Sequence, residues 1–213
     1  MTRARGIPML LVLLCFVPAL RGQTRLRIGA EAGVNVATAA ASPLADGVAT
    51  SPRTGLMAGL LFEVPVSSAW SLTVSPRFIE KGAELHYRDA LVETALLNYV
   101  EASVAARWTL PHAPLSPFLT AGCTVGRLVS GRYRIEFQRG YTTQYVEELL
   151  AQWDLALDVG AGLSYDAGGG NAVFVSAVYS FGLMNVNDGA AGVGASRWHA
   201  RGLRVSTGFA VGL

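Results

Sequence analysis

The stretch RTGLMAGLLFEVPVSSAWSLTVSPRFIEKG, residues 53–82, consists of two alternating segments around a short turn at residues 65–69. In both segments large apolar residues alternate with small, hydroxyl or charged ones, as in Trp70, Leu72 and Val74 against Ser71 and Thr73. A period of two indicates β-strands with two unlike faces. The stretch therefore predicts a hairpin with one apolar face and one face of small and polar residues.

The same alternation recurs along the chain, so the hairpin is one unit of a larger sheet. The other predicted strands cover residues 26–36, 98–110, 118–129, 153–165, 172–183 and 203–213. Four long irregular segments, residues 37–52, 82–96, 130–152 and 184–199, alternate with short connections at 65–69, 111–117 and 166–171. Within the third long segment, residues 145–151 could form a helical turn. Eight strands is a number at which a sheet can close into a barrel.

The first 22 residues differ from the rest. Basic residues at Arg3 and Arg5, an apolar run over residues 7–17 and a short polar exit predict a signal peptide at residues 1–22 that is removed. The domain that follows is predicted to span residues 23–213. Lipidation at Cys15 is an alternative, but Leu14 is not the small residue that such sites prefer.

Removal of this segment changes the charge of the chain. The full sequence has 17 basic and 15 acidic residues, and loss of Arg3, Arg5 and Arg21 leaves 14 against 15, or −1. A near-neutral chain gives no reason to expect a nucleic-acid partner. Cys123 is then the one remaining cysteine, so no internal disulfide is expected.

Two barrel types fit eight alternating strands. A soluble barrel of the lipocalin kind points its apolar set inward, whereas a membrane barrel points it toward lipid. The polar set is rich in glycine, serine and threonine and carries five basic and five acidic residues, which favours a narrow, self-neutralising lumen. The long and short connections also match the outer loops and periplasmic turns of membrane barrels.

We therefore predict an all-β, eight-stranded antiparallel up-and-down transmembrane barrel in the outer membrane of a Gram-negative cell. The predicted lumenal charge network consists of Arg27, Glu31, Arg53, Glu63, Arg77, Glu101, Arg107, Asp154, Asp158 and Arg204. The predicted lipid-facing residues are Leu56, Leu60, Phe62, Trp70, Leu72, Phe78, Val104, Trp108, Leu155, Leu157, Val175 and Phe209. Residues 81–82, Lys-Gly, are expected to mark the exit of the hairpin toward an outer loop.

Several segments resemble a known family. These include IGAEAGVNVAT at residues 28–38, the hairpin ending at Lys81-Gly82, and LNYVE at residues 97–101. Together with the later strands they resemble the outer-membrane β-barrel domain family, which includes the PorT-like and small OmpX/OmpA-type proteins of Bacteroidetes and relatives. The resemblance implies an outer-membrane location and no catalytic residues, and some members belong to a secretion machinery. Such barrels usually end in an aromatic residue, whereas this chain ends in Leu213.

Little in the sequence indicates chemistry. His86 and His199 lie on the side of the long loops and His112 lies in a short turn, without the spacing of a hydrolase or a metal site. Residues 168–170, Gly-Gly-Gly, lack the Lys-Ser/Thr of a phosphate loop. We expect no catalytic, metal or cofactor site.

Three functions remain open at this point. The first is a non-enzymatic barrel with a filled lumen, whose outer loops contact partners or the cell exterior. The others are a narrow porin-like channel and, less favoured, a surface enzyme that modifies lipid or peptide. The expected partners are outer-membrane lipid, the barrel-assembly machinery during insertion, and a protein bound through the outer loops.

Overall fold

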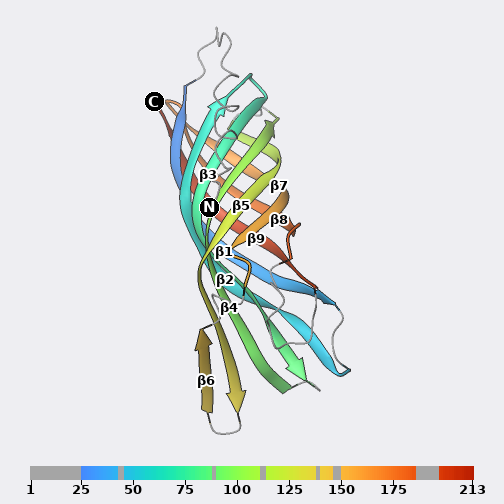
Figure 1. The fold of residues 1–213 in the computed structure, drawn as a ribbon. Coiled ribbons are helices and arrows are strands. Elements are labelled where there is room, and N and C mark those ends of the chain that lie inside the picture. Colours follow the sequence, from blue (N-terminus) through green and yellow to red (C-terminus); the bar gives the residue numbers. More distant parts are fainter. Residues whose placement is uncertain are drawn as a thin grey trace, which may run out of the picture.

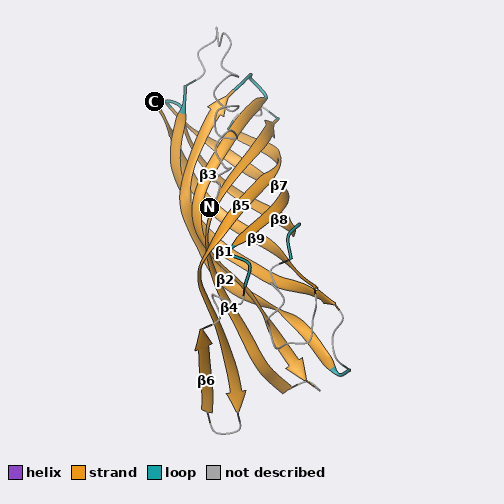
Figure 2. Cartoon of the chain, viewed as in Figure 1, coloured by secondary structure: helices purple, strands orange, loops and turns teal. Residues whose placement is uncertain are grey.

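The computed structural model describes residues 25–42, 46–87, 90–110, 114–137, 140–145, 150–185 and 197–213, and these residues are organised as strands and turns (Figure 1, Figure 2). The strands are β1 (Arg27–Ser42), β2 (Val48–Pro65), β3 (Trp70–Tyr87), β4 (Ala90–Thr109), β5 (Leu115–Phe137), β6 (Gly140–Tyr145), β7 (Trp153–Gly168), β8 (Asn171–Gly182) and β9 (Arg197–Gly212). Across these ranges, no helix is long and apolar enough to cross a membrane. The predicted signal peptide lies outside the described residues.

Eight of these strands close into a barrel. The sheet order is β4-β3-β2-β1-β9-β8-β7-β5-β6, and a further pairing of β4 with β5 completes the ring. Every described pairing is antiparallel, and the first and last barrel strands, β1 and β9, are neighbours. The predicted fold class is confirmed: the protein is an eight-stranded antiparallel barrel. β6 is an additional strand that pairs only with the end of β5 among the described residues.

The long segments predicted as irregular are mostly strand. β3 and β4 run through residues 82–96 and meet at Tyr87 and Ala90, while β1 and β2 take up most of 37–52. β5 and β6 fill much of 130–152, and β9 begins at Arg197 rather than after residue 199. The suggested helical turn at 145–151 overlaps the end of β6 at Tyr145, and residues 146–149 lie outside the described part. These predictions were wrong because the strands continue beyond the lipid. There the residues no longer alternate between lipid and lumen, so the sequence lacks the period of two that identifies a strand.

The outward face carries an apolar band. On β3 it extends from Trp70 to Phe78, about nine residues, which is close to the roughly 9–11 residues of a membrane-spanning strand. At the end away from the short turns, outward-facing polar residues limit this band on neighbouring strands: Thr54, Glu80, Asn98, Arg127 and Arg201. We call this the outer end, because periplasmic turns in such barrels are short.

Beyond the band, several strands continue as one sheet. Its strands are the start of β2 (48–52), the end of β3 (80–87), the start of β4 (90–98), the end of β5 (130–137) and β6, and we call it the outer sheet. β1 does not join it, because the β1–β2 ladder stops at Ala37 and Arg53 while β1 continues along β9. Figure 1 shows the hairpin of β5 and β6 projecting beyond the rest of the barrel.

Two apolar clusters lie inside the barrel. The outer plug, on the side of the outer sheet, contains Met57, Ile79, Ala83, Ala95, Leu97, Tyr99, Leu128, Tyr133 and Leu150. The turn-side plug, near the short turns, contains Leu61, Phe118, Phe174 and Ala210. The Phe118 and Phe174 rings of this plug lie against glycines of the neighbouring strands. A Cβ on Gly162 would lie 2.3 Å from Phe118 Cζ, and one on Gly208 would lie 2.5 Å from Phe174 Cζ, so both positions need a residue without a side chain. The lumen is therefore occupied by side chains on both sides of its charged middle.

Candidate functional site

Arg77 is the centre of a charge network between the two plugs. Its side chain projects from β3 and is buried, with carboxylates from three other strands around it. The guanidinium nitrogens lie 3.1 Å from Glu101 on β4, 3.6 Å from Asp158 on β7 and 3.7 Å from Glu31 on β1. It also donates hydrogen bonds to Ser103 and Thr124. One guanidinium from β3 thus links carboxylates of three other strands and two hydroxyl groups.

Asp158 and Arg204 extend this network across β7 to β9. Arg204 Nη2 lies 2.8 Å from Asp158 Oδ2, and its Nη1 donates to Ser180 Oγ at 2.7 Å. Thr124 and Ser180 each donate a hydrogen bond to Asp158 at 2.6 Å. Arg77, Arg204 and the Thr124 hydroxyl thus lie at Asp158 Oδ2. The Ser180 hydroxyl donates to Oδ1, so both oxygens of this buried charge are compensated.

Lys81 completes the network toward the outer plug. Its ammonium group lies 2.8 Å from Asp154 Oδ2, contacts Glu101 and lies 5.0 Å from the centre of the Tyr99 ring. Lys81 and Asp154 are 8% and 2% exposed, so this pair is removed from solvent. The expectation that Lys81 marks the exit to an outer loop was wrong, because β3 continues to Tyr87 and the lysine points into the lumen.

Glu63 lies near two arginines at the short-turn side of the lumen. Its carboxylate lies 3.6 Å from Arg27 and 3.8 Å from Arg107, and it accepts a hydrogen bond from Ser71 at 2.7 Å. The Arg107 guanidinium carbon lies 3.6 Å from the centre of the Phe118 ring, so cation–π contact supplements a long ion pair. Arg107 thereby joins the charge network to the turn-side plug.

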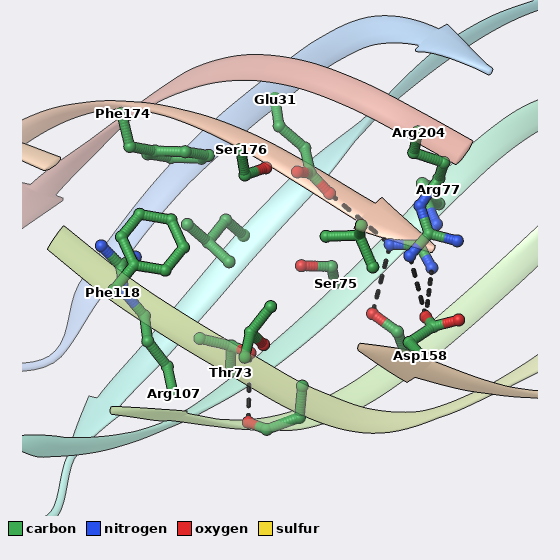
Figure 3. Close-up of a pocket in the computed structure, with 15 residues that line it drawn as sticks. Glu31, Thr73, Ser75, Arg77, Arg107, Phe118, Asp158, Phe174, Ser176 and Arg204 are labelled. Atoms are coloured by element: carbon green, nitrogen blue, oxygen red, sulfur yellow. Dashed lines mark hydrogen bonds and ion pairs between the residues drawn. The ribbon is translucent and has the colours of Figure 1, made fainter. Parts of the chain in front are cut away.

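A small chamber lies between the network and the turn-side plug. Its volume is about 70 Å³, which is room for a few waters. Figure 3 shows Arg77, Arg204 and Asp158 at one end, and Arg107 with Phe118 and Phe174 at the other. Hydroxyl groups of Thr73, Ser75 and Ser176 line the space between them. Charged, hydroxyl and apolar side chains therefore share the lining of the chamber, and packed side chains bound both of its ends.

All ten residues of the predicted network project inward, but among the described residues two of them form ion pairs only with residues outside that set. Asp154 pairs with Lys81, and Arg53 pairs with Glu80 at 3.9 Å while donating to the Lys81 carbonyl. Sequence reasoning missed both partners. Lys81 has the same strand parity as Arg77, which could have revealed it, whereas Glu80 reaches Arg53 only because a bulge lies between Pro52 and Met57 in the β2–β3 ladder.

The twelve residues predicted to face lipid all have outward positions. Leu56 is 64% exposed and Phe209 54% exposed, whereas Phe62, Val104 and Trp108 are half-buried among outward neighbours. Trp70 and Trp108 are direct partners across β3 and β4 near the short turns. Arg127 is a charged residue on the outward face, and its guanidinium lies 5.9 Å from the Trp153 ring at the outer limit of the band.

The histidines differ in their surroundings. His86 Nε2 lies 2.8 Å from Ser51 Oγ and 3.8 Å from Glu84, on the outward face of the outer sheet. In a hydrolase relay the acid holds the ring nitrogen opposite the one that contacts serine, whereas here both partners approach the same nitrogen. His199 is half-buried on β9 opposite Ala40, and His112 lies outside the described residues. No group of three or more metal-binding side chains occurs in the described ranges.

Two groups of the outer sheet, the half-buried Glu93 and the buried Tyr133, have shifted pKa values. Burial raises the pKa of Glu93, whose backbone pairs with Ile135 of β5. Burial and the nearby Glu93 also raise the pKa of Tyr133, which lies in the outer plug. Tyr133 is 4% exposed and Glu93 is half-buried, so the inner face of the outer sheet is only partly open to water.

Comparison with known proteins agrees with this architecture. The neisserial surface protein A structure has 16% identity and a TM-score of 0.52, with 88% of this chain and 97% of that chain covered. The outer membrane protein OprG of Pseudomonas aeruginosa has 10% identity and a TM-score of 0.51, with 90% and 99% covered. At these identities the similarity concerns the fold alone. No curated protein matches the sequence significantly.

A family model settles the membership. The model described as outer membrane protein beta-barrel domain matches residues 21–188, which is most of the chain. It does not distinguish a PorT-like subfamily. The chain therefore belongs to the outer membrane protein beta-barrel domain family, and its location is the cell outer membrane.

Proposed function

We propose that the protein is a non-conducting, non-enzymatic barrel that holds the outer sheet at the cell exterior for contact with a partner. The observation that supports this role is the filled lumen. Two apolar plugs enclose a layer in which buried cations and carboxylates pair with each other. A barrel built in this way supports a rigid outer structure and is poorly suited to carry solutes.

Planar-bilayer recording of the refolded chain tests the filled lumen. We expect no stable unit conductance for the wild type. A double variant, Phe118→Ala with Phe174→Ala, serves as the matched control, because it removes the two rings of the turn-side plug while leaving the charges in place. Stable unit currents from the wild type would favour the narrow-channel alternative and refute this proposal.

A surface enzyme is the second candidate, because Ser51 and His86 are within hydrogen-bond distance. Labelling with a fluorophosphonate probe tests whether Ser51 is an activated nucleophile. We expect no labelling beyond that of the Ser51→Ala variant. Labelling that requires both Ser51 and His86 would support hydrolysis instead. Participation in an outer-membrane secretion machinery would be one form of the partner-binding role.

A further inference from the structure

β6 forms one edge of the outer sheet. It pairs with β5 from Arg132–Tyr145 to Phe137–Gly140, and within the described ranges no strand pairs with its other side. Alternate residues of an antiparallel strand turn their N–H and C=O groups away from the neighbour. β6 therefore presents a row of backbone donors and acceptors that another extended chain could pair with.

This edge lacks the features that usually protect one. The β6 sequence, GYTTQY, has no charged residue and no proline, and threonine and tyrosine favour strands. The opposite edge of the outer sheet, at the start of β2, ends in Pro52 and is followed by a bulge. Because proline cannot donate to a ladder and a bulge interrupts pairing, the β2 edge is protected and the β6 edge is not.

The face beside the edge is basic and aromatic. Tyr141, Thr143 and Tyr145 share this face with alternate residues of β5, and Tyr141 and Tyr145 are 66% and 73% exposed. The Arg134 guanidinium lies 5.0 Å from the centre of the Tyr141 ring, so the arginine of β5 contacts an exposed tyrosine of the edge strand. Residues 132–137 contain two arginines and one glutamate. A strand added beside β6 would meet a positive charge, which an acidic residue on that strand would complement.

The other face of β5 and β6 offers an added strand fewer contacts. Tyr133, which has the other strand parity, is buried in the outer plug at 4% exposure. An added strand would therefore present one face to the barrel side and only the other to the exposed arginine and tyrosines. Recognition would depend on every second side chain of the added strand.

A second copy in the same membrane does not satisfy this edge by antiparallel pairing. Two antiparallel copies of one strand are related by a two-fold axis perpendicular to the sheet. Figure 1 shows β6 continuing along the long axis of the molecule. Rotation about such an axis would invert the second barrel relative to the first, which one membrane does not allow. The edge is therefore suited to a different chain.

We infer that the β6 edge binds an extended acidic segment of a partner protein, which adds a strand to the outer sheet beside Tyr141 and Arg134. This inference rests on the proposed role of the outer sheet in partner contact. Main-chain hydrogen bonds supply the pairing, and alternate carboxylates supply the selectivity.

Fluorescence anisotropy with the full refolded chain in lipid nanodiscs tests the inference. The probe is a labelled peptide, Thr-Glu-Val-Glu-Val-Glu-Val-Thr, compared with the same peptide carrying lysine for glutamate and with one N-methylated at alternate residues. We expect saturable binding of the acidic peptide, at least about tenfold weaker binding of the basic one, and loss of binding on methylation. Absence of binding up to about 1 mM acidic peptide would overturn the inference.

Two proline variants locate the contact. Of Thr142 and Thr143, one turns its N–H toward β5 and the other toward the free edge. The proline variant of the threonine whose N–H points to the free edge should abolish peptide binding and leave hydrogen exchange in β5 unchanged. The other proline variant, Thr142→Pro or Thr143→Pro, should abolish binding and also increase exchange in β5. Arg134→Gln should weaken binding by about fivefold without changing exchange.

Other outcomes are equally decisive. Peptide binding that survives both proline variants would place the contact elsewhere and overturn the inference, and so would protected amides on both sides of β6 in the free protein. Failure of the proposed filled lumen is detected separately, as conductance in the bilayer. A non-conducting barrel that binds no peptide would reject the β6 site alone.

Discussion

Removal of the Lys81 ammonium should be strongly destabilising, and a second substitution should rescue it. Asp154 has Lys81 as its one cation within 4.0 Å among the described residues, at 2.8 Å, and is 2% exposed. Two unit charges at this distance interact by about 6 kcal/mol at an effective dielectric constant of about 20. Much of this energy offsets desolvation, and breaking one side of a buried pair costs about 3–5 kcal/mol. We expect a loss of that size in Lys81→Met.

The double variant Lys81→Met with Asp154→Asn should be more stable than Lys81→Met alone. It removes both charges and leaves Glu101 with Arg77 at 3.1 Å, so the expected loss is about 1–2 kcal/mol. The second substitution then recovers about 1–4 kcal/mol, and together with the loss measured for Asp154→Asn alone the coupling free energy is at least that large. Arg53 and Glu80 provide a matched control, because their 3.9 Å pair is partly exposed and should couple by less than about 1 kcal/mol.

Urea unfolding of the refolded protein in lipid vesicles, followed by tryptophan fluorescence, measures these free energies. Trp70 and Trp153 lie on the outward face and report the transfer from lipid to water. Additive losses in the double variant would refute the argument, since they would mean that Lys81 and Asp154 do not compensate each other's charge. Equal coupling in the control pair would show that burial does not determine the energy.

Three further outcomes are expected. Gly162→Val should destabilise the barrel by about 2 kcal/mol in urea unfolding, because its Cβ would lie 2.3 Å from both Phe118 Cζ and the Val175 carbonyl oxygen. Phe118→Ala should relieve the part of this loss that the ring causes, and a Gly162→Val barrel as stable as wild type would contradict the packing. The Cys123 thiol, exposed on the apolar face, should react with a water-soluble maleimide slowly in vesicles and rapidly in urea, whereas equal rates would place it in water. Since burial raises the pKa of Glu93, ionisation of its carboxyl group opposes folding. The outer sheet should therefore lose hydrogen-exchange protection as pH rises above about 4.5, the ordinary pKa of a glutamate. Glu93→Gln should remove this pH dependence, and a dependence that persists in the variant would refute the role of Glu93.

The sequence predicts the membrane part of the fold well for a physical reason. Between Trp70 and Phe78 each residue faces either lipid or a narrow lumen, so two environments impose a period of two. In the outer sheet neither environment is present. Leu85 is buried while Glu84 is half-exposed, and Gly82 and Ala83 are both buried, so the alternation that identifies strands fades over residues 82–96.

The ion pairs of the lumenal network are harder to predict from the sequence than the inward or outward orientation of its side chains. Strand parity is enough to direct Arg77, Glu101 and Asp158 inward, but it does not determine which pairs meet. Those contacts depend on how far each strand is shifted relative to the others around the ring, as between Arg77 and Glu101, which are direct partners in the β3–β4 ladder. The partners of Asp154 and Arg53 required the length of β3 and the position of one bulge, and neither was evident from composition.

The lumenal charges also explain how this barrel selects one register. Lipid is a uniform environment, so the outward leucines and valines would be satisfied after many shifts of one strand along its neighbours. A shift of β9 by one residue would instead turn Arg204 toward lipid, at a cost of about 2–4 kcal/mol at the bilayer midplane, and would leave Asp158 without its cation at 2.8 Å. A shift by two residues would keep the facing but separate Arg204 from Asp158 by about 7 Å along the strand. Buried pairs between nonadjacent strands therefore penalise every small shift, including those that the apolar face tolerates, and the charged lumen specifies the closure that positions the outer sheet.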